Sequence, residues 1–309
     1  MSEQTFIGVD VSKNKLDVAE ARGAEFKSFD NTEEGQCKLK DFIASKKPTL
    51  IVLEATGGFE KGILRVLASA RLPVVLVNPR QVRDFARAVG ILAKTDKIDA
   101  RVIARFAEAV KPEVRPLRSE EGEMFDALNA RRFQIVEMIT AEKNRLIHAT
   151  KWTKSGIEGH VKMLERFLAE INKEMDDLIK NSPIWHKKDK ILQSIPGVGK
   201  VMSRTLLADL SEIGTLSRKQ ISALAGVAPL NRDSGLYKGR RSIWGGRSKV
   251  RTVLYMCAVT AIRCNPKIKS FYERLRVAGK CFKVAITACM RKLLVIINTM
   301  MKNQTCWAS

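Results

Sequence analysis

Short apolar runs separated by turn residues fill the first 110 residues of the chain. Five runs have the length and composition of strands, at Thr5–Val9, Leu16–Ala21, Glu25–Phe29, Leu50–Leu53 and Val74–Val77. Four longer segments have helical start and stop signals, at Thr32–Ser45, Glu60–Ala70, Pro79–Val89 and Thr95–Val110. Three strands followed by alternating helices and strands predict an α/β domain with a mixed sheet.

This element order is that of the RNase H-like fold, by analogy rather than by periodicity. Pro112 and Pro116 end the block, so we place a first domain at residues 1–114.

A charge-rich helical segment follows, and we place it at residues 115–183. Its second half carries apolar residues at alternating spacings of four and three, which predict a coiled-coil seam: Ile157, Val161, Leu164, Leu168, Ile171, Met175 and Leu178. Trp152–Gly156 is expected to let the chain turn back. The pattern fits either an antiparallel helical hairpin or a helix pair that dimerises.

The remaining residues, 184–309, predict a mainly helical domain interrupted by a basic loop from Asn231 to Ser248. Lys249–Arg263 and Phe282–Met301 read as amphipathic or buried helices. No run of 18 or more apolar residues and no leader-like start occur, so we expect a cytoplasmic protein with no membrane partner. The six cysteines show no metal-ligand spacing, so zinc is not expected.

Positive charge is concentrated in the second half of the chain. The chain has a formal charge of +22, and residues 181–309 contain 24 Lys and Arg against 5 Asp and Glu. Residues 1–180 contain 31 against 28. This separation indicates that the second half faces a polyanion, and nucleic acid is the favoured class.

Four acids occupy positions where ligand-binding groups collect in α/β domains. Asp10 and Glu54 end two apolar strands, and Asp96 and Asp99 lie a turn apart on one helix face. Hard oxygen ligands suit Mg²⁺ or Mn²⁺, which can also bind a phosphate oxygen. Taken singly, Asp10 could be a turn residue, Glu54 a surface acid and Asp96 a helix cap. Asp17 and Glu60 are the acids most easily mistaken for members of the set.

Two features of the basic half suit phosphate contact. Ile195–Lys200 places Gly197, Gly199 and Lys200 in a tight turn between two apolar helical stretches, as in helix–hairpin–helix DNA binders, although plain turn chemistry gives the same letters. The loop beyond it contains a serine, Ser234, beside glycines that permit close backbone approach. Ser234 could be a nucleophile or a simple turn residue. The candidate phosphate contacts in this loop are Arg232, Lys238, Arg240, Arg241, Arg247, Lys249 and Arg251.

The combination of these motifs resembles a DEDD-type family of bacterial insertion-sequence transposases, whose relatives include pilin-gene inverting recombinases. In the front half the resemblance is carried by Gly8–Lys13, Leu53–Gly58 and Lys94–Ala100. In the back half it is carried by Ile195–Gly199, Leu224–Pro229, Asp233–Gly235, Gly246-Arg247, Arg251, Leu254–Met256 and Arg291–Leu294. It covers nearly the whole chain in the same order.

The resemblance implies a RuvC-like front domain in which Asp10, Glu54, Asp96 and Asp99 hold Mg²⁺. It implies that Ser234 attacks a DNA phosphate and forms a phosphoserine link. It also implies a structured non-coding RNA that pairs with donor and target DNA. Strand exchange requires several cuts, so we expect a dimer or tetramer held partly by the 157–178 seam. The resemblance also suggests that the serine and the acids at one phosphate can come from different subunits.

Two other functions stay open from sequence alone. A RuvC-like structure-specific nuclease, such as a junction resolvase, would use the acids to activate water and would form no covalent intermediate. A non-catalytic nucleic-acid binding protein with a nuclease-like fold would cut no strand. The presence of a DNA-linked protein separates the recombinase from both.

Overall fold

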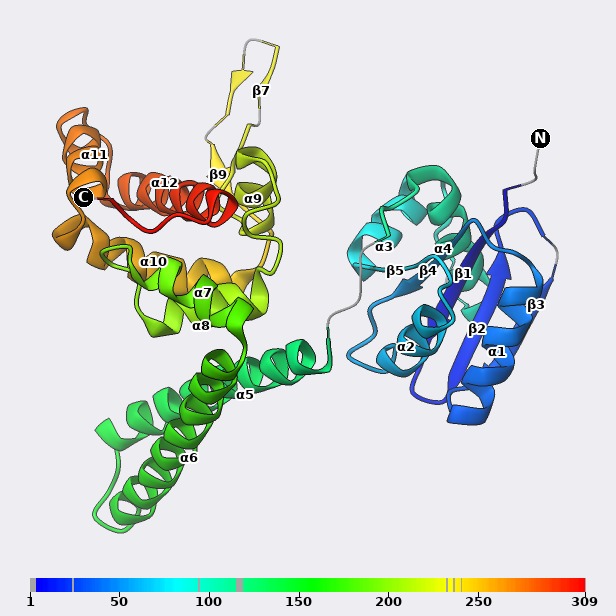
Figure 1. Ribbon diagram of the computed structural model, residues 1–309, viewed down its shortest axis with the longest axis horizontal. Coiled ribbons are helices and arrows are strands. Elements are labelled where there is room, and N and C mark those ends of the chain that lie inside the picture. Colours follow the sequence, from blue (N-terminus) through cyan, green and yellow to red (C-terminus); the bar gives the residue numbers. More distant parts are fainter. Residues whose placement is uncertain are drawn as a thin grey trace. The chain divides into compact units, whose positions relative to one another are not determined.

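The computed structural model describes residues 4–23, 25–93, 95–114, 119–231, 233–235, 237–239 and 241–308 (Figure 1). The chain divides into two compact units, Met1–Leu117 and Arg118–Ser309. The helical segment predicted at 115–183 belongs to the second unit together with the C-terminal helices.

The first unit is built on a five-stranded mixed sheet. Its strands are β1 (Phe6–Val11), β2 (Lys15–Glu20), β3 (Phe26–Asp30), β4 (Leu50–Glu54) and β5 (Val74–Val77), in the spatial order β3-β2-β1-β4-β5. The first three strands pair antiparallel, and β1, β4 and β5 pair parallel. The predicted mixed α/β sheet is confirmed, with strand ends displaced by one or two residues.

Helices cover both faces of this sheet, because its inner strands are apolar on both sides. On one face, Ile7, Val9 and Leu53 pack with α1 (Glu33–Ser45) and α2 (Lys61–Ser69). On the other face, strand residues such as Val52 pack with α3 (Pro79–Ala88) and α4 (Asp96–Val110). Three of these helices begin where the sequence offers a side-chain cap: Thr32, Asn78 and Thr95.

Gly8 is the point where α4 lies closest to the sheet. A Cβ atom added at Gly8 would overlap the α4 backbone at Ala100, Ile103 and Ala104. The missing side chain therefore sets the distance between β1 and α4, and with it the distance from β1 to the acids at the start of that helix.

Gly8→Ala is expected to destabilise the first unit by about 1–3 kcal/mol, because α4 must move off the sheet. Urea unfolding measures this effect. Gly57→Ala is a useful comparison, because space around Gly57 is open and only its backbone φ of 65° disfavours a side chain. Unchanged stability in Gly8→Ala would contradict this account of the packing.

The second unit begins with two long helices, α5 (Glu120–Ile147) and α6 (Lys154–Asn181), that run antiparallel. Phe125 near the start of α5 packs with Met175 and Ile179 near the end of α6. Lys143 Nζ lies 2.8 Å from the Glu165 carboxylate further along the pair. All seven residues of the predicted seam are buried or half-buried. Those that pack against α5 are covered by contacts within the same chain. Supercoiling of the two helices and dimerisation through this seam stay predictions.

The C-terminal helices surround one large apolar core. They are α7 (Pro183–Gln193), α8 (Lys200–Asp209), α9 (Arg218–Leu224), α10 (Ser248–Cys264), α11 (Pro266–Val277) and α12 (Phe282–Asn303). Two short ladders lie inside the predicted basic loop. In these, β6 (Pro229–Leu230) pairs with β9 (Ser242–Ile243), and β7 (Asp233–Ser234) pairs with β8 (Tyr237–Lys238).

The helix α12 is the one described helix that is long and apolar enough to cross a membrane. Its composition has another explanation in this fold. Ile286, Cys289, Leu293 and Ile297 are at most 1% exposed and lie in the core of the second unit. A central position among α7, α9, α10 and α11 therefore accounts for the apolar character of α12.

Candidate active site

Asp10 and Glu54 lie at the same end of two neighbouring parallel strands. Register pairs Val9 with Leu53, so Asp10 and Glu54 are the next residues along β1 and β4. Side chains alternate along a strand, so Asp10 shares a face with Gly8, and that face is covered by α4. The helix α4 begins with Asp96 and holds Asp99 in its first turn. The sequence therefore folds to bring its four predicted acids to one end of the first unit.

The electrostatics of Asp10 reflect the acids around it. The pKa of Asp10 is raised from 3.8 to about 6. Burial is the largest cause, followed by the negative charges of Asp99, Asp17 and Asp96. Both acids on α4 thus act on the acid of β1.

Asp17 and Glu60, the acids most easily mistaken for members of the set, each have a structural position of their own. Asp17 is the register partner of Asp10 on β2 and is 7% exposed, so it adds charge beside the site. The Glu60 carboxylate accepts hydrogen bonds from the backbone N–H groups of Thr56 (3.0 Å) and Gly58 (2.9 Å). Glu60 therefore holds the loop after Glu54 in place.

The donor set has the chemistry of a site for Mg²⁺ or Mn²⁺, because it consists of carboxylates whose mutual repulsion a cation would relieve. In the described parts of the chain, no group of three or more His, Cys, Asp or Glu side chains is already arranged to hold a metal ion. Asp10, Glu54, Asp96 and Asp99 would have to close around a bound ion.

The turn predicted to contact phosphate joins α7 to α8. Gly199 is the N-cap of α8 and has no side chain to cap it, and space around its Cα is open. Gly197 has a different role. Its φ is +96°, and a Cβ there would lie 2.8 Å from the Ala261 side chain on α10. Packing alone thus requires glycine at 197, whereas Gly199 leaves the positive end of α8 open.

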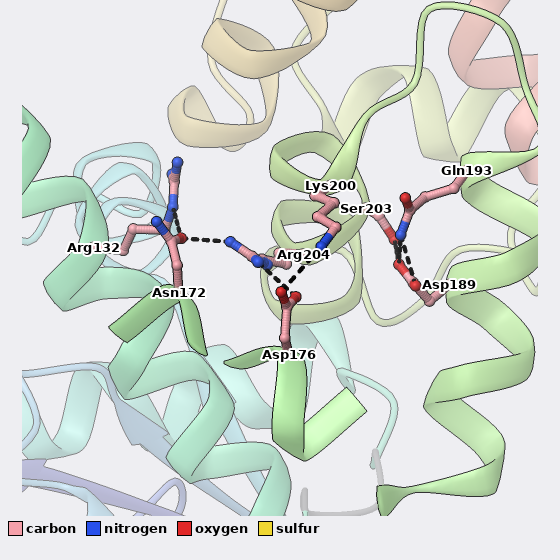
Figure 2. A network of polar contacts seen from close by, with 8 residues as sticks. All are labelled: Arg132, Asn172, Asp176, Asp189, Gln193, Lys200, Ser203 and Arg204. Carbon is pink, nitrogen blue, oxygen red and sulfur yellow. Dashed lines mark hydrogen bonds and ion pairs between the residues drawn. The ribbon is translucent and has the colours of Figure 1, made fainter. Parts of the chain in front are cut away.

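Lys200 belongs to a polar network that ties α6 to α8 (Figure 2). Its Nζ lies 3.2 Å from Asp176 Oδ2, and Arg204 Nη2 lies 2.5 Å from Asp176 Oδ1. Arg204 also donates to Asn172 Oδ1, which accepts a second hydrogen bond of 3.0 Å from Arg132 Nε. The Lys200 side chain is 63% exposed. The Lys200 side chain can therefore contact a phosphate, whereas the Arg204 side chain, 6% exposed, is buried.

Ser234 lies at the end of a small β-hairpin. Asp233 and Ser234 of β7 pair with Lys238 and Tyr237 of β8, and Gly235 makes the turn with φ of +55°. Ser234 is exposed. Figure 1 shows β7 projecting from the helices of its unit. A hydroxyl at this position is accessible to a large ligand.

Three of the remaining predicted phosphate contacts, Arg247, Arg251 and Lys249, have contacts within the protein. Arg247 donates to both Glu212 carboxylate oxygens (2.6 Å each) and to the Asp209 carbonyl oxygen (2.7 Å). Arg251 donates to the Gly245 carbonyl oxygen. Lys249 Nζ lies 5.4 Å from the Phe133 ring centroid. These contacts give Arg247 and Arg251 a role in shaping the loop.

Four other predicted contacts remain, two of which lie outside the described residues. Arg241 lines an apolar cavity of about 900 Å³ beside β9 and α12. Lys238 lies in β8. Arg232 and Arg240 lie outside the described residues.

The network around Arg204 is the feature that sequence analysis missed. Its only sequence signal is the spacing of Asn172 and Asp176, which places two polar side chains on one face of α6 beside the seam. Nothing in the sequence indicates that Arg204 is their partner.

Comparisons with known proteins extend over most of the chain. One family model, described as a transposase with the DEDD motif, matches residues 7–151, and one described as the IS116/IS110/IS902 transposase family matches residues 189–273. A pilin gene-inverting protein of Moraxella lacunata is 28% identical over 303 residues, covering 95% of this chain and 94% of the relative. The corresponding Moraxella bovis protein gives the same values. An uncharacterized 42 kDa protein of insertion element IS900 from Mycobacterium paratuberculosis is 26% identical over 259 residues, covering 78% of this chain and 64% of that protein.

Proposed function

Because the chain belongs to the IS116/IS110/IS902 transposase family and is a DNA transposase, we propose that it cuts and rejoins DNA through a phosphoserine intermediate. The observation that supports this proposal is that Asp10 and Glu54 end neighbouring parallel strands, while α4, which begins with Asp96 and holds Asp99 in its first turn, packs against β1. Ser234 on its exposed hairpin would supply the nucleophile.

The proposed step is a transesterification. The Ser234 Oγ attacks a backbone phosphorus, a serine–phosphate ester forms, and one sugar oxygen leaves as a hydroxyl after gaining a proton. The serine proton is lost in the same step. The serine–phosphate ester conserves the energy of the broken phosphodiester bond, so a second sugar hydroxyl can displace Ser234 and reseal the strand without ATP.

Asp10, Glu54, Asp96 and Asp99 are the residues that would hold Mg²⁺ or Mn²⁺. Bound there, the ion would stabilise negative charge on the phosphate undergoing transfer. The residues of the chain provide the rest: Gly8 keeps α4 close to β1, and Glu60 holds the loop that follows Glu54.

Rejoining rather than simple cleavage is favoured by the relatives. Two of them are named pilin gene-inverting proteins, and inversion requires that cut ends be resealed. We extend this requirement to the present chain as part of the proposal. A dimer or tetramer would then bring the several cutting sites together.

A structured guide RNA is a further part of the proposal, and donor and target DNA are its pairing partners. The supporting observation is the excess of 24 Lys and Arg over 5 Asp and Glu in residues 181–309, because such an excess suits contact with nucleic-acid phosphates. Purification from the host followed by sequencing of the bound RNA tests this part. A complex that is active on DNA after complete RNA removal would contradict it.

Ser234→Ala is expected to abolish the covalent protein–DNA adduct and to leave nucleic-acid binding intact, because only the attacking oxygen is removed. The adduct is measured as a slower band on a denaturing gel after incubation of the RNA-containing complex with matching DNA and Mg²⁺.

Ser242→Ala is the matched control, since Ser242 lies on β9 in the same basic segment and has no part in the proposed step. An adduct that survives in Ser234→Ala would overturn the serine mechanism. Cleavage without any adduct in the unmodified protein would favour the junction-resolvase function.

A further inference from the structure

Tyr237 is the nearest neighbour of Ser234 across the β7–β8 ladder. The register pairs these two residues at the turn end of the hairpin. Residues directly opposite each other in an antiparallel ladder point to the same face, with Cβ atoms about 4.5–5.5 Å apart. The aromatic ring and the candidate nucleophile therefore occupy one side of the same small structure.

The Tyr237 side chain contributes little to the packing of the protein. It is 68% exposed. Among the described residues it has no hydrogen-bonding, ionic or aromatic partner. The other two tyrosines are less exposed: Tyr255 is 38% exposed, and Tyr272 packs against the Phe282 ring.

The surroundings of Tyr237 favour a nucleic-acid strand over a protein partner. Residues 229–251 contain seven Lys and Arg and a single acid, Asp233. Basic groups that track a phosphate backbone, combined with an exposed ring, are the means by which proteins bind unpaired or distorted nucleotides.

We propose that Tyr237 is a positioning residue that stacks on a nucleotide flanking the phosphate attacked by Ser234. This inference rests on the proposed function of Ser234. A ring whose own Cβ lies about 5 Å from the serine Cβ reaches the base or sugar next to a phosphate held at Oγ. Stacking there fixes the strand relative to the hydroxyl, and it suits many sequences because every base has an aromatic face.

The ring, rather than the phenol hydroxyl, is the group in use. Tyr237→Phe should therefore resemble the unmodified protein, whereas Tyr237→Ala should raise the DNA concentration for half-maximal adduct formation by roughly 5- to 150-fold.

The experiment uses the purified RNA-containing complex and a DNA duplex that carries the cleavage point mapped from the wild-type adduct. 2-Aminopurine replaces the base on either side of that point. Stacking by Tyr237 should quench its fluorescence in the unmodified protein, in Tyr237→Phe and in Ser234→Ala, and should not do so in Tyr237→Ala. Trp152→Ala is the matched control, because Trp152 is an aromatic residue 80% exposed on a different hairpin.

The outcomes separate this inference from the proposed function. Quenching that persists in Tyr237→Ala, a Phe variant as defective as the Ala variant, or an adduct mapped to the Tyr237 oxygen would each overturn the inference. Absence of any adduct in the unmodified protein would instead overturn the serine mechanism, while the fluorescence arm would still report on stacking. Loss of quenching in Trp152→Ala would show that the effect is not local to the serine hairpin and would also overturn the inference.

Discussion

Asp10→Asn is expected to make the protein more stable at pH 8 in EDTA while abolishing its divalent-ion-dependent activity. The pKa of Asp10 is raised to about 6 in the folded chain, against 3.8 for an unperturbed aspartate, first by burial and then by the charges of Asp99, Asp17 and Asp96. A raised pKa means that folding favours the protonated form. The stabilising effect of this protonation is fully present below pH 4 and is lost as the pH rises through 6.

The raised pKa sets an upper bound of roughly 3 kcal/mol when Asp10 is fully ionised, and solvent screening of this partly exposed carboxylate lowers it to about 1–2 kcal/mol. Asparagine carries no charge at any pH, so Asp10→Asn should gain up to that amount at pH 8 and nothing at pH 3.5. Urea unfolding at the two pH values measures the difference.

The metal arm of the same experiment gives an independent readout. Mg²⁺ should raise the Tm of the unmodified protein at pH 8, because the ion offsets the repulsion among the acids, and should have a smaller effect on Asp10→Asn. Asp41→Asn on the exposed side of α1 is the control and should behave as the unmodified protein in both arms. A variant no more stable than the unmodified protein at pH 8 would contradict the raised pKa of Asp10.

Asp176→Ala should cost about 3–5 kcal/mol of stability, the usual effect of removing one partner of a buried ion pair. The Arg204 guanidinium is 6% exposed and would lose the carboxylate that lies 2.5 Å away. The other acceptor of Arg204, Asn172, is shared with Arg132 and carries no charge, so it does not replace the Asp176 carboxylate.

The stability contributed by Asp176 should depend on pH in the opposite sense to that of Asp10. Burial opposes its ionisation, but hydrogen bonds from Arg204 and Lys200 hold its pKa below the usual 3.8. A lowered pKa gives stability that is present above pH 4 and is lost as the pH falls further. The difference between Asp176→Ala and the unmodified protein should therefore shrink in acid.

Asp177→Ala is the matched control, since Asp177 is the exposed next residue on α6, and its cost should stay within about 0.5 kcal/mol. A double variant, Asp176→Leu with Arg204→Met, should recover much of the lost stability by replacing the ion pair with apolar contacts. Equal unfolding free energies for Asp176→Ala and Asp177→Ala would show that the network does not join α6 to α8.

The elements that could be predicted from sequence are those with a local signal. Periodicity and caps such as Thr95 located the strands and helices of the first unit to within one or two residues. The α11 helix was not predicted, although Asn265 and Pro266 form a signal for the start of a helix. In the structure Asn265 is the cap, because its Oδ1 accepts a hydrogen bond from the backbone N–H of Ile268. Two-residue ladders such as β7–β8 have no periodicity and were read as loop.

Long-range partners could not be predicted. The heptad spacing of α6 indicated an apolar stripe, but the sequence did not distinguish a partner in the same chain from one in another copy. Ile135 and Ile139 of α5 pack with Leu164 of that stripe within the chain. Arg247 was grouped with the phosphate contacts because its acceptor, Glu212, lies 35 residues away. The acids were predictable because strand ends and a helix start meet at one edge of an α/β sheet.

The base of the α5–α6 hairpin also determines how accurately its far end is placed. From Arg132 to Ile147 the helix extends about 23 Å beyond the Asn172 contact, so a tilt of roughly 10° at the base would move Trp152 by about 4 Å. That displacement exceeds a single base-pair step of roughly 3.4 Å. The hairpin can therefore act as a fixed spacer only while the charged residues at its base prevent it from swinging.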